Sequence, residues 1–96
     1  MLILVTYDVS TKTAAGERRL RKVALVCQDF GQRVQKSVFE CSVDQATYED
    51  LTRRLVGCID KDEDSLRFYR LVEPRDRYQK VFGINHAVDF EAPLIF

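Results

Sequence analysis

The chain has 96 residues, of which 46% are hydrophobic and 31% charged, a composition that fits a folded core and excludes a disordered protein. Fifteen Lys and Arg side chains balance fifteen Asp and Glu side chains, so no overall charge draws the chain to nucleic acid or to a membrane. At this length we expect one domain that spans residues 1–96.

The cysteines and the apolar runs indicate a cytoplasmic protein. The three cysteines, Cys27, Cys41 and Cys58, include no C-x-x-C pair, and their spacing fits neither a disulfide framework nor a zinc site. The apolar start of the chain is too short for a signal peptide and lacks its basic residues, and no later run could span a bilayer. We therefore expect the reducing cytoplasm and no membrane partner.

The chain opens with MLILVTYDVS, an apolar run that ends in a carboxylate. The segment from Leu2 to Val5 is apolar at every position, which is typical of a strand that is covered on both faces. Asp8 therefore marks the point where a buried strand reaches the surface.

A polar connection, residues 10–16, leads into a helix that is predicted from about Ala14 to Phe30 and ends before Gly31. Its apolar residues recur at helical spacing, and they are Leu20, Val23, Ala24, Cys27 and Phe30. Its basic residues fall largely off that stripe, and they are Arg18, Arg19, Arg21 and Lys22. The helix is thus predicted to pack on one side and to be basic on the other.

Charge is distributed unevenly along the chain. From Lys12 to Lys36 there are seven basic residues and two acidic ones, whereas from Glu40 to Asp64 there are eight acidic residues and three basic ones. This asymmetry favours one face for an anion and another for water or a basic partner. The alternative is a pair of helices whose polar faces are simply solvated.

The second half of the chain is predicted to form short strands around one more helix. RVQKSVFECSV is rich in β-branched and aromatic residues, and a change of phase around residues 35–37 predicts two strands joined by a bulge or tight turn. Asp44 can cap a second helix, and LRFYRLV, residues 66–72, is the next predicted strand. VFGI, residues 81–84, is a candidate for one more short strand, and the chain finishes EAPLIF.

The order strand, helix, strand, strand, helix, strand predicts an α+β ferredoxin-like βαββαβ fold with an extra short C-terminal strand. Its antiparallel sheet would carry both helices on one face. Because a small open sheet rarely leaves a broad apolar face in water, we expect a two-fold homodimer that covers the other face. The C-terminal tail, about residues 85–96, is expected to pack on this dimer or on the edge of a partner.

Asp8 admits three interpretations. It could cap the turn after the first strand, pair with an arginine of the first helix or with Arg33, or bind a divalent metal through hard oxygen atoms. One carboxylate is a poor Mg²⁺ site, but a two-fold dimer supplies each residue twice. Two Asp8 side chains that meet at the axis would repel each other unless a cation lay between them.

Several segments together resemble one known family. They are LVTYDVS, the basic helix after it, GQRVQKSVFEC, SLRFYRL and the ending DFEAPLIF. In these segments, and in the order and spacing of TYD and RVQKSVFE, the chain is similar to the CRISPR-associated protein 2 family, the small partner of the CRISPR adaptation integrase. The resemblance implies a ferredoxin-like homodimer, antiviral defence through acquisition of new spacers, association with the integrase subunit of the CRISPR-associated protein 1 family, and metal-dependent nuclease activity.

The resemblance also implies roles for single residues. Asp8 matches the family's metal-binding aspartate, one from each protomer, and the two would share Mg²⁺. Tyr7, Arg33 and Phe39 match positions linked to the nucleic-acid site, and we group them with Asp8 as candidate catalytic residues. Arg19 and Arg21 match the family's basic helix. The candidate nucleic-acid-binding set is Arg18, Arg19, Arg21, Lys22, Arg33 and Lys36.

Two functions are compatible with these residues. In the first, paired Asp8 carboxylates hold Mg²⁺ in an endonuclease for RNA or duplex DNA, and Arg33 binds a flanking phosphate. In the second, the dimer is a non-catalytic scaffold that bridges integrase dimers and binds duplex DNA through its phosphates, so that Asp8 is dispensable. A third class, an RNA-recognition sheet with the same element order, is disfavoured because Phe39 is the only candidate base platform in RVQKSVFEC and LRFYRL is a weak substitute.

Overall fold

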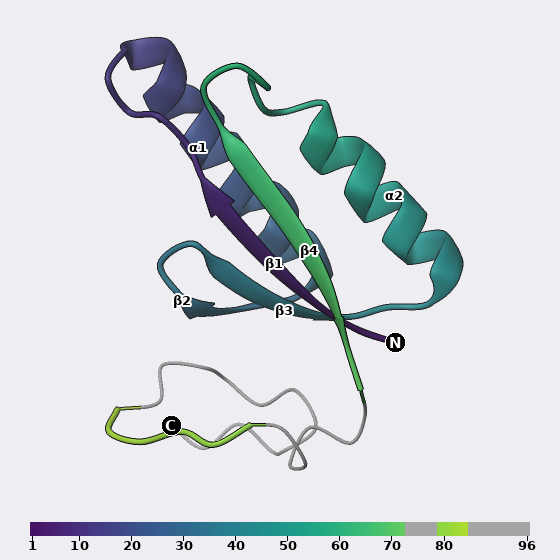
Figure 1. The fold of residues 1–96 in the computed structure, drawn as a ribbon. Helices are drawn as coiled ribbons and strands as arrows, with labels where there is room; N and C mark the ends of the chain where they lie inside the picture. Colours follow the sequence, from purple (N-terminus) through teal and green to yellow (C-terminus); the bar gives the residue numbers. More distant parts are fainter. Residues whose placement is uncertain (73–78, 85–96) are drawn as a thin grey trace.

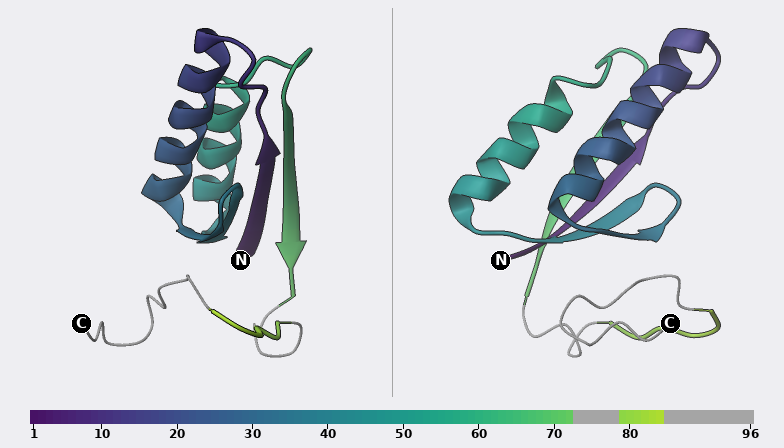
Figure 2. Two further views of the ribbon diagram at one scale, coloured as in Figure 1. Left: turned by 90° about the vertical axis from the view of Figure 1, so that its left-hand side faces the viewer. Right: turned by 180° about the vertical axis from the view of Figure 1, so that it is seen from behind.

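The computed structural model describes residues 1–72 and 79–84 and forms the first six predicted elements in the predicted order. They are β1 (Leu2–Asp8), α1 (Ala14–Phe30), β2 (Gln32–Gln35), β3 (Val38–Ser42), α2 (Gln45–Val56) and β4 (Ser65–Leu71). The strands make one antiparallel sheet in the order β2-β3-β1-β4. Both helices cover the same face of this sheet (Figure 1, Figure 2). The predicted ferredoxin-like fold is confirmed.

β1 lies inside the sheet, between β3 and β4, which explains its apolar sequence. Ile3, Val5 and Tyr7 are buried in the core under the helices. Because successive side chains of a strand point to opposite faces, every second residue of β1 lies on the other side of the sheet. We call that side the helix-free face, and on β1 and β4 its residues are Leu2, Leu4, Thr6, Asp8, Ser65, Arg67, Tyr69 and Leu71.

Capping groups set the ends of α1 where the sequence predicted them. Gly16 N–H donates a hydrogen bond to the Thr13 hydroxyl at 3.1 Å, and Gly31 N–H donates to the Cys27 carbonyl at 2.9 Å. The buried stripe of α1 is wider than predicted and includes Val26, because α1 packs against α2 as well as against the sheet.

The second helix begins at the predicted cap. Thr47 N–H donates to the Asp44 carboxylate at 2.7 Å, and this bond holds the pKa of Asp44 below its usual range. Leu51 and Leu55 are fully buried and anchor α2 in the core. The bulge expected between β2 and β3 is also confirmed, since their register shifts between Arg33 and Gln35.

Gly31 is expected to tolerate no side chain. An added Cβ would overlap the Glu40 carbonyl oxygen and the Cα and Sγ atoms of Cys41 in β3. Gly31→Ala should therefore lower the free energy of unfolding, measured in denaturant, by about 3 kcal/mol. Gly57→Ala is the matched control, because its Cβ would meet only two α2 carbonyl oxygens, at 3.4 and 3.6 Å. Equal losses in both variants would contradict the close contact of Gly31 with β3.

Burial makes two of the three free cysteines unreactive. Burial raises the pKa of the Cys27 thiol to about 12 and that of the Cys41 thiol to about 11. We expect iodoacetamide to alkylate half-buried Cys58 in the native protein, and Cys27 and Cys41 only after unfolding. Mass spectrometry of the labelled peptides measures this order. Rapid native labelling of Cys27 would contradict the packing of α1 on the sheet.

The end of the chain departs from one prediction. Residues 81–84 form no strand, because a strand requires a neighbouring edge to bond with and this segment pairs with none in the described part of the chain. β4 begins and ends one residue earlier than predicted. The loop at 73–78 and the predicted tail at 85–96 lie outside the described residues. No helix among the described residues is long and apolar enough to cross a membrane.

Candidate active site

Asp8 is the last residue of β1 and is exposed on the helix-free face. Its cross-strand neighbour is Ser65, the first residue of β4. Tyr7, one position earlier, is buried in the core on the opposite face. The strand therefore delivers the Asp8 carboxylate to the surface at the end of an inner strand of the sheet, as the sequence predicted.

The turn after β1 is held by Asp64 and not by Asp8. The Asp64 carboxylate, which is fully buried, accepts hydrogen bonds from Ser10 N–H at 3.0 Å and from Asp60 N–H at 2.8 Å. In residues 1–72 and 79–84, no group hydrogen-bonds or pairs with the Asp8 carboxylate. The capping interpretation of Asp8 is therefore wrong, because the carboxylate that organises this turn comes from the loop before β4.

Arg19 also bonds to Asp64, and this bond changes the role expected for Arg19. Its Nε atom donates to Asp64 at 2.8 Å and its guanidinium reaches Glu63 at 3.1 Å. This ion pair lowers the pKa of the Asp64 carboxyl and raises that of Arg19. Because two carboxylates neutralise it, Arg19 ties α1 to the loop before β4, and the structure favours this role over a phosphate contact.

Tyr7, Arg33 and Phe39 are brought together, but on the helix-covered side of the sheet. The Arg33 guanidinium lies 5.1 Å from the centroid of the Phe39 ring, and the Tyr7 and Phe39 ring centroids are 6.3 Å apart. The Tyr7 hydroxyl donates to the Lys36 carbonyl at 3.3 Å, and burial raises its pKa. Asp8 belongs to the opposite face, so these four candidate residues do not form one cluster.

Phe39 has no exposed surface, so it cannot act as a platform for a base. Its ring instead supports Arg33, which is exposed. This burial removes the main candidate platform of an RNA-recognition sheet, which needs exposed aromatic side chains, and in LRFYRL only Tyr69 is an exposed aromatic residue.

Three basic side chains of α1 remain on the surface. Arg18, Arg21 and Lys22 are exposed, and their spacing of three and four residues places them on one side of the helix. We call them the basic stripe. Lys36, in the turn between β2 and β3, is exposed as well. Of the predicted nucleic-acid-binding set, only Arg19 is engaged by carboxylates in the described structure.

The model of the family described as CRISPR associated protein Cas2 matches residues 1–81. The chain belongs to this family. It is 63% identical over 95 residues to the CRISPR-associated endoribonuclease Cas2 1 of Moorella thermoacetica, with 99% of each chain covered. It is 49% identical over 96 residues to the CRISPR-associated endonuclease Cas2 of Halalkalibacterium halodurans, with all of both chains covered.

The structure is similar to solved Cas2 structures. Streptococcus pyogenes Cas2 superposes with a TM-score of 0.78 at 53% identity, over 86% of this chain and 100% of the other. A hypothetical protein from Thermus thermophilus gives a TM-score of 0.73 at 34% identity, over 88% of this chain and 92% of the other. The family resemblance found in the sequence is thus confirmed, together with the fold.

The Asp8 carboxylate has the chemistry of a metal ligand, but alone it completes no metal site. The described residues contain no group of three or more His, Cys, Asp or Glu side chains that could hold a metal ion. Asp8 itself is an exposed carboxylate with no partner among the described residues, and it is the hard oxygen ligand that Mg²⁺ prefers. Since one such ligand completes no site, a second copy of the chain would have to supply the rest.

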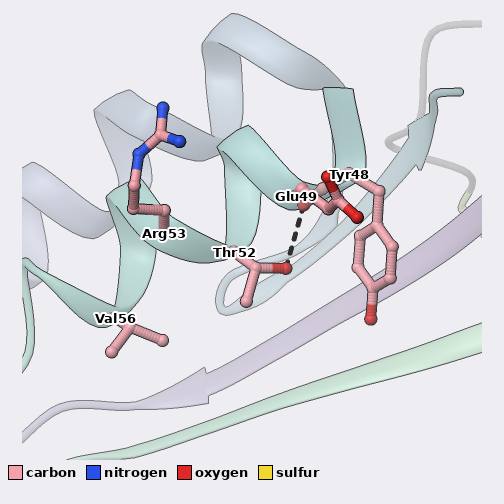
Figure 3. A pocket seen from close by; sticks show the side chains of 5 residues that line it. All are labelled: Tyr48, Glu49, Thr52, Arg53 and Val56. Atoms are coloured by element: carbon pink, nitrogen blue, oxygen red, sulfur yellow. Dashed lines mark hydrogen bonds between the residues drawn. The ribbon is translucent and has the colours of Figure 1, made fainter. Parts of the chain in front are cut away.

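A hollow on the surface of α2 in this Cas2 chain is lined by none of the predicted residues. Its lining residues are Tyr48, Glu49, Thr52, Arg53 and Val56 (Figure 3). The Thr52 hydroxyl donates to the Tyr48 carbonyl at 2.9 Å, so its donor is satisfied within the helix. The hollow therefore has no part in the candidate site around Asp8.

Proposed function

We propose that this Cas2-family chain is a Mg²⁺-dependent endonuclease that acts on RNA or duplex DNA, as a homodimer, in CRISPR spacer acquisition. The observation that carries the proposal is the Asp8 carboxylate, exposed at the end of β1 and bound by no described group. The relatives from M. thermoacetica and H. halodurans are named endoribonuclease and endonuclease, and these names support a nuclease.

The homodimer is proposed from exposed apolar side chains. Tyr69, on the helix-free face, is 45% exposed, and Val72, just beyond β4, is 75% exposed. Val81, Phe82 and Ile84 are exposed as well. Small proteins seldom leave such a set of side chains in water. A second copy packed on the helix-free face would cover Tyr69 and bring the two Asp8 carboxylates together.

Two Asp8 carboxylates facing each other would hold Mg²⁺ and be relieved of their mutual repulsion. Bound there, Mg²⁺ supplies a Lewis acid for a phosphate oxygen and lowers the pKa of a water. The position of Asp8 therefore determines where the phosphate that is cleaved must bind. Arg33 lies on the other face, so it would bind a phosphate farther along the same nucleic acid than the one cleaved.

The test of this function is cleavage of single-stranded RNA and of duplex DNA in a Mg²⁺ titration. Cleavage should rise with Mg²⁺, vanish in EDTA and return when Mg²⁺ is restored. An Asp8→Asn preparation, purified in parallel, monitors contaminating nuclease. Cleavage that persists in EDTA, or is equal in both preparations, would contradict the proposal.

A second function is favoured by the basic stripe. Exposed Arg and Lys side chains bind phosphates without reading bases, which suits a protein that must accept any captured sequence. In this function the dimer is a scaffold that bridges integrase dimers of the CRISPR-associated protein 1 family and carries duplex DNA. Asp8 is then dispensable, so spacer integration that survives Asp8→Asn would favour the scaffold over the nuclease.

Reversing the charge of the basic stripe is expected to weaken duplex binding. In the variant Arg18→Glu, Arg21→Glu and Lys22→Glu, the slope of log K against log salt should fall by about 0.9 for each phosphate that the protein no longer binds. Fluorescence anisotropy at several salt concentrations measures this slope. Arg53→Glu, an exposed substitution on α2, is the control and should leave the slope unchanged. An equal slope in all three proteins would exclude the stripe as the DNA surface.

A further inference from the structure

The register between β1 and β4 places a hydroxyl beside the Asp8 carboxylate. Asp8 pairs with Ser65, the first residue of β4. Leu66 and Phe68 pack against the core, so Ser65 points to the helix-free face, the same face as Asp8. Directly opposed residues of antiparallel strands have Cβ atoms about 5 Å apart, close enough for both side chains to contact one ligand.

Both side chains are available to a ligand. Ser65 is exposed, and no described group hydrogen-bonds to its hydroxyl, just as none bonds to the Asp8 carboxylate. The nearest arginine on this face, Arg67, donates to the Tyr69 hydroxyl at 3.3 Å. Tyr69 lies farther along β4 from Ser65, so this bond draws the guanidinium away from Asp8. No described cation therefore competes for the carboxylate.

A hydroxyl at this position would add a hydrogen-bonding group to a metal site that otherwise consists of two carboxylates. Mg²⁺ keeps several of its waters when carboxylates bind it, and those waters need hydrogen-bond acceptors. A serine hydroxyl can accept such a bond and can donate another to the carboxylate. In a two-fold dimer, two carboxylates and two hydroxyls would surround the ion, instead of two carboxylates alone.

We propose that Ser65 is a positioning residue of the Asp8 site, whose hydroxyl hydrogen-bonds to the water shell of the divalent cation that Asp8 holds. This inference rests on the metal site of the proposed function. Groups that orient metal ligands from outside the first coordination sphere commonly change metal affinity about tenfold or more. Because each dimer contains Ser65 twice, its removal should be measurable.

The experiment measures Mn²⁺ affinity directly, by electron paramagnetic resonance of the free ion, in the absence of substrate. Ser65→Ala should weaken Mn²⁺ binding about tenfold. Ser65→Thr keeps a hydroxyl and suits a strand, so it should bind nearly as the wild type does. Ser42→Ala is the matched control, because Ser42 is an exposed serine at the end of β3. Thermal melts would verify that all variants are folded.

The outcomes separate this inference from the function on which it rests. If the wild type and Ser65→Ala bind Mn²⁺ equally, the role of Ser65 is overturned while the metal site stands. If Ser65→Thr binds as weakly as Ser65→Ala, the hydroxyl has no role and the inference is overturned too. If the wild type binds no better than Asp8→Asn, the metal site fails and Ser65 fails with it.

Discussion

Asp8→Asn is expected to lower Mg²⁺-dependent cleavage at least about 100-fold, which corresponds to about 2.7 kcal/mol of transition-state stabilisation. Asparagine has nearly the same size as aspartate, and Asp8 is exposed with no described partner, so the fold should be unaffected. The substitution removes negative charge, because the proposed dimer loses both carboxylates of its metal site. Metal ions contribute several kcal/mol to phosphate hydrolysis, and this contribution is what the variant removes.

The matched control for Asp8→Asn is Asp29→Asn. Asp29 is an exposed aspartate near the end of α1, which covers the other face of the sheet, so its substitution removes the same charge away from the helix-free face. Initial rates of cleavage at saturating Mg²⁺ compare both variants with the wild type. Only Asp8→Asn should lose activity, and equal losses in the two variants would mean that net charge, not a site at Asp8, governs the rate.

Asp64→Ala is expected to cost about 3 kcal/mol in the free energy of unfolding. Its carboxylate is fully buried and accepts hydrogen bonds from the Ser10 and Asp60 backbones and from Arg19. Alanine would leave these donors unsatisfied in a closed space, which is the costly case for a lost hydrogen bond. Denaturant unfolding followed by circular dichroism measures the loss.

The control for Asp64→Ala is Asp29→Ala. Asp29 pairs with Arg54 at 3.1 Å, but both side chains are exposed, so its removal should change stability by less than about 0.5 kcal/mol. If Asp29→Ala lowered the free energy of unfolding as much as Asp64→Ala does, burial would not explain the stabilisation by the Asp64 ion pair.

The lowered pKa of the Asp64 carboxyl also makes the free energy of unfolding depend on pH. The hydrogen bond from Arg19 is the main cause that holds the pKa of Asp64 below its ordinary value of 3.8. Below that value the unfolded chain binds more protons than the folded chain. The contribution of Asp64 is therefore complete above pH 3.8 and is lost as pH falls through the pKa of the folded state. Asp64→Asn should flatten this part of the acid-unfolding curve, and an unchanged curve would contradict it.

The sequence predicted the fold well where local patterns decide it. Asp44 marks a helix start because its side chain accepts a hydrogen bond from the first turn, and Gly31 marks a helix end because its backbone N–H closes the last turn. The apolar run of β1 follows from its position inside the sheet. The segment 81–84 was predicted as a strand from composition, but pairing needs a partner edge, which composition does not specify.

The candidate site was predicted less completely, because distant contacts decide it. Asp8 was recognised as a candidate because it ends a run of apolar residues, and this pattern is local in the sequence. The bond between Arg19 and Asp64 spans 45 residues, and no spacing in the sequence distinguishes Arg19 from the other basic residues of α1. Phe39 belongs to a segment whose apolar residues alternate along the sequence, but only the packing of the Arg33 guanidinium over its ring shows that Phe39 supports Arg33.

The central claim is that two chains share one divalent cation through Asp8. Its most direct test is a Mn²⁺ titration by calorimetry on a sample whose mass is measured by light scattering in the same buffer. We predict a dimer that binds one ion for every two chains, and loss of that binding in Asp8→Asn. A monomer, one ion for each chain, or unchanged binding in Asp8→Asn would contradict the shared site.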